Sequence, residues 1–96
     1  MFTLVDSLPE FEWDPRKNTM NVEKHGISLE EARELFADPE RIEVRLSYPG
    51  EPRYAVVGRL RGKHWTAIIT YREGRTRIIS VRRSHPFEER AYDEKL

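Results

Sequence analysis

One segment carries polar side chains at a spacing that places them on one side of a helix. Lys17, Asn21, Lys24 and His25 fall at positions i, i+4, i+7 and i+8, and residues so spaced share one helix face. Lysine attracts phosphate, and histidine transfers protons near neutral pH. The stripe fits the wall of a cleft that handles phosphate, and it also fits a solvated helix surface.

Arginines form the second candidate group. Between Arg53 and Arg83 the chain holds nine basic residues and one acidic residue, Glu73, although the whole chain has zero net charge. Guanidinium groups match phosphate oxygens and stay charged. Local positive charge therefore favours a nucleic acid or an acidic protein as partner. One sheet face is expected to combine hydroxyls and guanidinium groups, if the register allows: Thr66, Thr70, Arg72, Thr76, Ser80 and Arg82.

Composition limits the remaining chemistry. The chain has no cysteine, which excludes disulfides, thiolate nucleophiles and cysteine-based metal sites. The three histidines show no metal-ligand spacing, so we expect neither a metal nor another cofactor. No apolar run is long enough to cross a membrane. The opening MFTLVDSLPE lacks the basic start of a signal peptide, so we expect a cytoplasmic protein.

The elements that must position these residues follow an α+β order. Asp14-Pro15 predicts a helix from Pro15 to about His25, which Gly26 ends. Ser28-Leu29-Glu30-Glu31 is a capping box for a second helix that ends at Asp38-Pro39. A short strand at Phe11–Trp13 comes first, and a last helix runs from Pro86 to about Lys95. Four further strands are predicted in between: Arg41–Tyr48, Arg53–Leu60, Trp65–Arg72 and Arg75–Arg83.

Short connections make the four later strands an antiparallel β-meander. The two N-terminal helices are expected to cover one face of this sheet, with Leu29, Ala32, Leu35 and Phe36 as the buried face of the second. The length of the chain predicts that residues 1–96 form a single domain.

Three stretches together resemble the BrnT toxins of bacterial type II toxin–antitoxin systems. They are FEWDPRK…N…KHGIS-L-EEA at 11–32, RYAVVG at 53–58 and RIISVRR at 77–83, and ERAYD at 89–93 extends the likeness. Two departures are Ser84-His85-Pro86 after the arginines and residues 1–9, an N-terminal extension beyond the usual start.

The resemblance implies a RelE-like fold and a ribonuclease that cleaves RNA and inhibits translation. It also implies neutralisation by a BrnA-like antitoxin, a ribbon-helix-helix protein through which the complex binds operator DNA. A homo- or hetero-oligomer is expected, and no membrane partner.

Metal-free RNA cleavage needs an aligned 2′-hydroxyl, proton transfer and stabilisation of the phosphorane. We hypothesise that His25 is a general acid or base aided by Lys24, although His25 also suits a simple helix C-terminus. Tyr92 is a weaker candidate for proton transfer. In this hypothesis the scissile phosphate contacts Arg77 and Arg82, and the substrate-binding residues are Lys17, Asn21, Arg53, Arg72 and Arg83.

The alternative function is a basic binding module without catalysis. The same arginines would then hold an acidic antitoxin segment or a DNA backbone, and both functions need the same charge. A catalytic site predicts a large loss from one or two substitutions, whereas a binding surface predicts a graded loss over many arginines.

Overall fold

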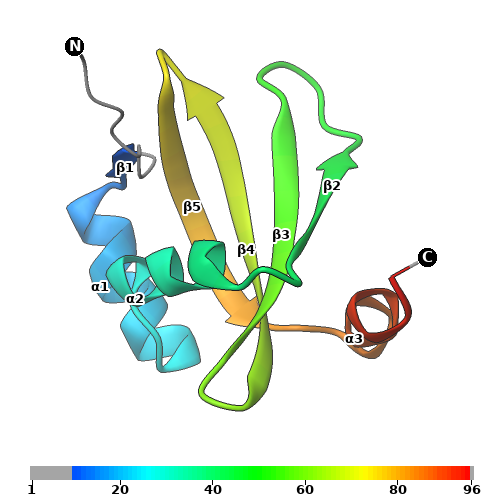
Figure 1. Cartoon of the computed structure of the whole chain (residues 1–96). Helices are drawn as coiled ribbons and strands as arrows, with labels where there is room; N and C mark the ends of the chain where they lie inside the picture. Colours follow the sequence, from blue (N-terminus) through cyan, green and yellow to red (C-terminus); the bar gives the residue numbers. More distant parts are fainter. Residues whose placement is uncertain (1–9, 96) are drawn as a thin grey trace, which may run out of the picture.

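The computed structural model describes residues 10–95 and has a five-stranded sheet with helices around it (Figure 1). The predicted N-terminal extension, residues 1–9, lies outside the described residues. The elements follow one another as β1 (Glu10–Glu12), α1 (Pro15–His25), α2 (Leu29–Ala32), the 3-10 helix η1 (Arg33–Ala37), β2 (Ile42–Leu46), β3 (Arg53–Leu60), β4 (Lys63–Arg72), β5 (Arg75–Arg83) and α3 (Pro86–Glu94).

The sheet has the strand order β1-β5-β4-β3-β2. Strands β2 to β5 pair antiparallel in sequence order, so the predicted meander is confirmed. The short first strand begins one residue earlier than predicted and pairs parallel with β5, with Glu10 opposite Arg75. Strand β2 is shorter than predicted and β4 is longer, since β4 starts at Lys63.

The core lies between one face of the sheet and the α2–η1 segment. Leu29, Ala32 and Leu35 are fully buried there, against a sheet face that includes Val56 and Ile69. The predicted capping box is present, because Glu31 N donates to Ser28 Oγ and Ser28 N donates to the Glu31 carboxylate. The second helix differs from the prediction in one respect: it is α-helical only to Ala32 and continues as a 3-10 helix to Ala37.

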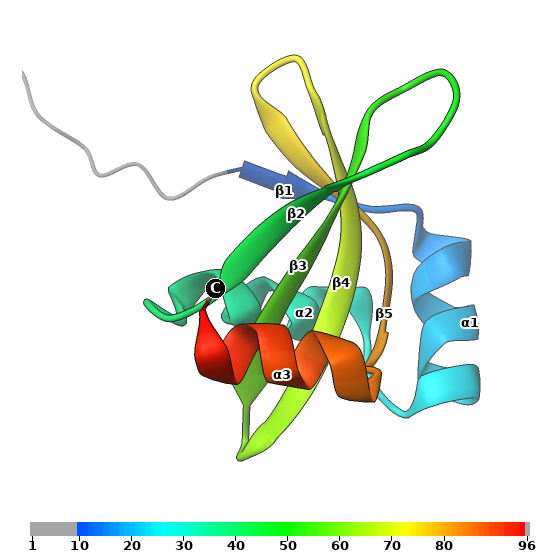
Figure 2. The same ribbon diagram turned by 90° about the vertical axis from the view of Figure 1, so that its right-hand side faces the viewer.

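The prediction that both N-terminal helices cover one face is wrong for α1. This helix lies beside the edge of β5, where backbone N–H and C=O groups point sideways from the sheet (Figure 2). The reason is in its sequence: its apolar residues form no stripe, and Met20 and Val22 are exposed. Its one buried residue is the polar Asn21. Helix α3 covers part of the opposite face, where Phe87 and Ala91 line a hollow together with Ala55 and Val57.

A β-bulge in β5 changes which residues share a face. Ser80 pairs with Ile68 and Ile78 pairs with Ile69, so Ile79 has no partner on β4. Ile78 and Val81 consequently both point into the core. The strict alternation predicted for β5 is therefore wrong. Thr76 leaves the predicted hydroxyl and arginine face, and Arg77 takes its place beside Ser80 and Arg82.

Candidate functional site

A groove of about 260 Å³ runs between α1 and the edge of β5. It contains all four members of the polar stripe predicted from the sequence. Its lining consists of Lys17, Met20, Asn21, Lys24, His25, Ile79 and Ser80. Helix α1 therefore borders a cleft, as the first of the two interpretations of the stripe predicted.

Asn21 fixes the geometry of this groove. Its Nδ2 donates to Ile27 O and to Val81 O, both at 2.8 Å, and its Oδ1 accepts from Val81 N at 3.1 Å. The amide thus pairs with the edge of β5 as a neighbouring strand would. A buried amide that lost these partners would leave backbone groups unsatisfied. Asn21 thereby holds α1 against β5, and its Nδ2 and Oδ1 already have partners.

The cations of α1 stand at the open side of the groove. Lys17 and Lys24 are exposed, and His25 is half-buried. Within residues 10–95, neither lysine is in a salt bridge. Gly26 ends the helix with a φ of 73°, a left-handed conformation that glycine adopts without strain. Lys24 and His25 therefore lie in the last turn, where positive charge is favourable.

Arg77 and Arg82 flank the groove residue Ser80 on one face of β5. Because of the bulge, Arg77 and Ser80 are neighbours on this face although three positions separate them. Both arginines are engaged by carboxylates that the sequence hypothesis did not include. Arg77 Nη1 donates to Glu12 Oε2 at 3.1 Å, and Arg82 donates to both oxygens of Glu88, at 2.8 and 3.0 Å.

Glu88, in the first turn of α3, accepts hydrogen bonds from groups besides Arg82. Its carboxylate also accepts from Thr66 Oγ1 at 3.0 Å and from His85 N at 2.7 Å. Burial would raise the pKa of Glu88, but the hydrogen bonds from Arg82, His85 N–H and Thr66 outweigh it and lower the pKa to about 2. Glu88 is therefore ionised at neutral pH and stabilises the junction of β5 with α3.

Comparison with known families places these residues in a wider context. The sequence model of a family described as the ribonuclease toxin BrnT of type II toxin–antitoxin systems matches residues 13–88. The chain belongs to the BrnT family. No individually curated protein matches it. The match includes every residue that lines the groove, and membership implies an antitoxin partner for this BrnT chain.

The other three predicted arginines of this BrnT protein lie away from the groove. Arg72 forms an ion pair with Glu51 at 2.8 Å. Arg53 stacks over Tyr48, 4.1 Å from the ring centre. Arg83 lies on the opposite face of the sheet from Arg82, over the ring of Trp65.

Tyr92, the weaker candidate for proton transfer, also lies outside the groove lining. Its hydroxyl donates to Asp38 Oδ2 at 2.8 Å and fastens α3 to the segment before β2. Burial, together with that hydrogen bond and the charge of Asp38, raises the pKa of Tyr92 to about 12. A phenol held in this way keeps its proton at neutral pH.

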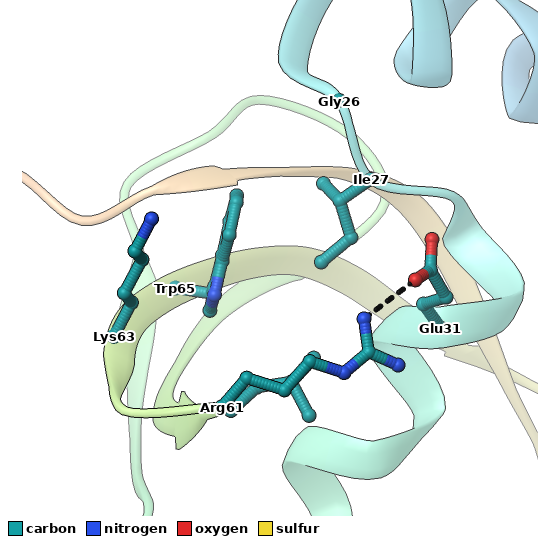
Figure 3. Close-up of a pocket in the computed structure, with 7 residues that line it drawn as sticks. Gly26, Ile27, Glu31, Arg61, Lys63 and Trp65 are labelled. Carbon is teal, nitrogen blue, oxygen red and sulfur yellow. Dashed lines mark hydrogen bonds and ion pairs between the residues drawn. The ribbon is translucent and has the colours of Figure 1, made fainter.

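A second hollow of this chain, about 180 Å³, adjoins the end of α1 through Gly26. Figure 3 shows its shape: Arg61 reaches toward Glu31 on one side, and Trp65 and Lys63 stand on the other. The Arg61–Glu31 ion pair measures 2.8 Å. No sequence pattern predicts this hollow, because its residues come from a loop, a helix and a hairpin.

No group of three or more histidine, aspartate and glutamate side chains within residues 10–95 is placed to hold a metal ion. No helix in that same range is long and apolar enough to cross a membrane.

Proposed function

We propose that this chain is a metal-independent endoribonuclease that cleaves mRNA in the α1–β5 groove and thereby inhibits translation. One observation carries the proposal. Basic side chains from two distant segments lie in or beside the same concavity: Lys17, Lys24 and His25 line it, and Arg77 and Arg82 flank the lining residue Ser80 on β5. Such a site attracts a phosphodiester and offers a proton-transfer group beside it.

The proposed reaction is an internal transesterification. His25 removes the proton of a 2′-hydroxyl, the 2′-oxygen bonds to phosphorus, and the bond from phosphorus to the 5′-oxygen breaks. The leaving 5′-oxygen takes a proton from Lys24 or from water, so the products are a 2′,3′-cyclic phosphate and a 5′-hydroxyl. The positive charge of Lys24 next to His25 stabilises the dianionic phosphorane.

The two flanking arginines have different capacities to bind phosphate. A guanidinium group has five N–H donors. Arg77 uses one of them on Glu12, whereas Arg82 uses three, on Glu88 and on Arg83 O. We assign the main phosphate contact to Arg77, and we assign to Arg82 the positioning of the β5–α3 junction and a secondary contact.

Substrate contacts extend along both faces of β5. Lys17 holds a neighbouring phosphate, Asn21 keeps the groove open, and Arg83 with Lys63 binds the strand where it passes the end of α1. Arg53 and Arg72 contribute to the long-range positive potential rather than to a direct contact, because Arg53 is stacked on Tyr48 and Arg72 is paired with Glu51, both away from Ser80.

The family supports the partner proposal. We assign the fold to the RelE type and the neutralising protein to the BrnA-like ribbon-helix-helix antitoxins. Operator DNA is bound only through that antitoxin. A cytoplasmic location follows from an mRNA substrate.

The test is RNA cleavage by the purified chain, freed from antitoxin, in the presence of EDTA. We expect cleavage and 2′,3′-cyclic phosphate ends, which are detected by end-group analysis. His25→Ala is expected to lower the rate about 10²–10⁴-fold, with an unchanged melting temperature. Cleavage that stops in EDTA and returns with Mg²⁺ would overturn the reaction class.

A matched control lies on the same helix. Arg16→Ala removes one positive charge from α1 at a position outside the groove, and it should leave the rate nearly unchanged. The alternative function, a basic binding module without catalysis, predicts no cleavage by the wild type. It also predicts an equal, graded loss of affinity for DNA in Arg16→Ala, Lys17→Ala and Lys24→Ala.

A further inference from the structure

Strand β2 forms one edge of the sheet and has a partner on one side only. Within residues 10–95 it pairs with β3 and with no other strand. Figure 1 shows no further strand of the described chain beside its outer edge. An edge of this kind presents a row of N–H and C=O groups that can pair with another strand.

The α3-side face of this strand is apolar and incompletely covered. Ile42, Val44 and Leu46 line a hollow of about 120 Å³, together with Ala55, Val57, Phe87, Glu88 and Ala91. Val44 is 49% exposed and Phe87 is 60% exposed. Large apolar side chains gathered at a strand edge favour contact with another protein surface over contact with water.

The opposite face of β2 carries one charge of each sign. Glu43 and Arg45 are exposed and flank Val44. If a second β2 runs antiparallel with Val44 opposite Val44, each Glu43 lies opposite an Arg45 of the other copy, and each Ile42 lies opposite a Leu46. The strand is thus complementary to itself in charge and in apolar character.

The same residues disfavour the neighbouring registers. If the pairing is centred on Glu43, two glutamates lie directly opposite each other, and if it is centred on Arg45, two arginines do. Like charges directly opposite each other are destabilising. A shift that moves Val44 opposite a charged residue would turn the second copy over and send its apolar face to the wrong side.

We propose that β2 pairs antiparallel with β2 of a second copy of this chain, in the register centred on Val44, and forms a symmetric dimer with one continuous sheet. Both α3 helices then lie on the same side of that sheet, where each Phe87 is close to the apolar row of the joined strands. The contact is small, and the dimer should therefore depend on concentration. The proposal does not rest on the ribonuclease activity.

The decisive experiment uses the charge pattern. Sedimentation velocity of the wild type should show a monomer–dimer equilibrium. Glu43→Arg alone places arginine opposite arginine, and Arg45→Glu alone places glutamate opposite glutamate. Each variant should dimerise at least about tenfold more weakly. An equimolar mixture of the two should form dimers again, because every pair across the contact is then of opposite sign.

Folding of each variant is checked by circular dichroism, because Glu43 also accepts a hydrogen bond from Tyr71 Oη at 2.8 Å. The mixture contains the same two variants that dimerise poorly alone. Recovered dimerisation in the mixture therefore cannot come from refolding of either variant. A wild type that stays monomeric at high concentration would overturn the proposal. A mixture that associates no better than either variant alone would also overturn the proposal. Pairing of β2 with a strand of a different protein would not rescue it.

A second measurement tests the register. The chain has no cysteine, so Val44→Cys introduces a single thiol at the symmetry axis, within the distance that a disulfide requires. Mild oxidation should link two copies rapidly. In the matched control Glu43→Cys, the two thiols are diagonal to each other and should link at least about tenfold more slowly, because their Cα atoms lie about 7–8 Å apart. Equal rates would contradict the register.

Discussion

The two ends of the proposed site hold their positive charges in opposite ways. On α1, Lys17 and Lys24 stand at the groove without a salt bridge among residues 10–95. At the junction of β5 with α3, both Nη atoms of Arg82 donate hydrogen bonds to the carboxylate of the buried Glu88. The basic segment from Arg53 to Arg83 therefore supplies less available charge than its composition indicates. The less basic N-terminal part supplies the cations that line the groove.

The difference separates a structural role from a binding role. A paired and buried cation contributes to stability, and removing either partner leaves the other uncompensated. An exposed cation contributes little to stability and acts mainly through attraction of a polyanion. Substitutions at the α3 junction should therefore change the free energy of unfolding, and substitutions on α1 should change activity.

The largest effect on stability is expected from Glu88→Ala. It leaves Arg82, Thr66 and His85 N–H without their shared acceptor, which should lower the free energy of unfolding by about 3–5 kcal/mol. Urea denaturation measures this value. Glu89→Ala, on the same helix turn but outside this hydrogen-bond cluster, is the control and should cost less than about 1 kcal/mol. A small effect of Glu88→Ala would remove the contrast between the two regions.

Asn21→Ala should affect both properties. Loss of its bonds to Ile27 and Val81 leaves buried backbone groups unsatisfied, at a cost of about 2–3 kcal/mol, and α1 should separate from β5. RNA cleavage should fall with stability. Asn18→Ala is the comparison, because Asn18 makes one bond to the backbone, accepting from Leu29 N at 2.7 Å, and should cost about 1 kcal/mol.

Sequence patterns were sufficient to predict the helices and strands, but not the hydrogen bonds of Asn21 that hold α1 against β5. Asp14-Pro15 and Gly26 set the limits of α1, and alternation along the later strands gave the meander, because caps and periodicity are local properties. The stripe containing Asn21 was interpreted either as a cleft wall or as a solvated helix surface. Its hydrogen bonds to Val81 join residues sixty positions apart, and no local pattern encodes such a contact.

The arginine face shows a second limit. The alternation of β5 predicts Thr76 with Ser80 and Arg82, but the unpaired Ile79 shifts the phase and brings Arg77 to that face. A bulge of one residue leaves no clear mark in sequence. The carboxylates of Glu12 and Glu88, which take up donors of both arginines, were missed for a similar reason: they belong to elements whose neighbours only the fold reveals.

Arg77→Ala should separate binding from structure. Its ion pair with Glu12 is only partly buried, so the free energy of unfolding should change by less than about 1 kcal/mol, while RNA cleavage falls about 10–100-fold. Arg75→Ala is a close control, because Arg75 also pairs with Glu12 but lies farther along β5 from Ser80. Equal activity of the two variants would remove Arg77 from the site. Arg82→Ala is a poorer probe, since it leaves Glu88 buried without its cation.

The loss of folding stability at low pH offers an independent measure of the junction between β5 and α3. The pKa of Glu88 lies at about 2 in the folded chain, below its unfolded value. Its contribution is therefore fully present above about pH 5 and is lost as pH falls toward 2. Glu88→Gln should unfold with a flatter dependence on pH in this range than the wild type does. Melting temperatures between pH 2 and 6 give the comparison, and parallel profiles would contradict the assigned role.

The smallest effect is expected from Lys17→Ala. Lys17 is exposed at the far end of the groove from His25, so its contribution is a single electrostatic contact with a flanking phosphate. Affinity for a short RNA should fall a few-fold at low salt, and the slope of log affinity against log salt should decrease by about 0.7. Both are measured by fluorescence anisotropy in the His25→Ala background, which prevents cleavage. Arg16→Ala carries the same loss of net charge, so a change common to both variants reflects the general potential of α1. Only the excess in Lys17→Ala locates the RNA strand in the groove.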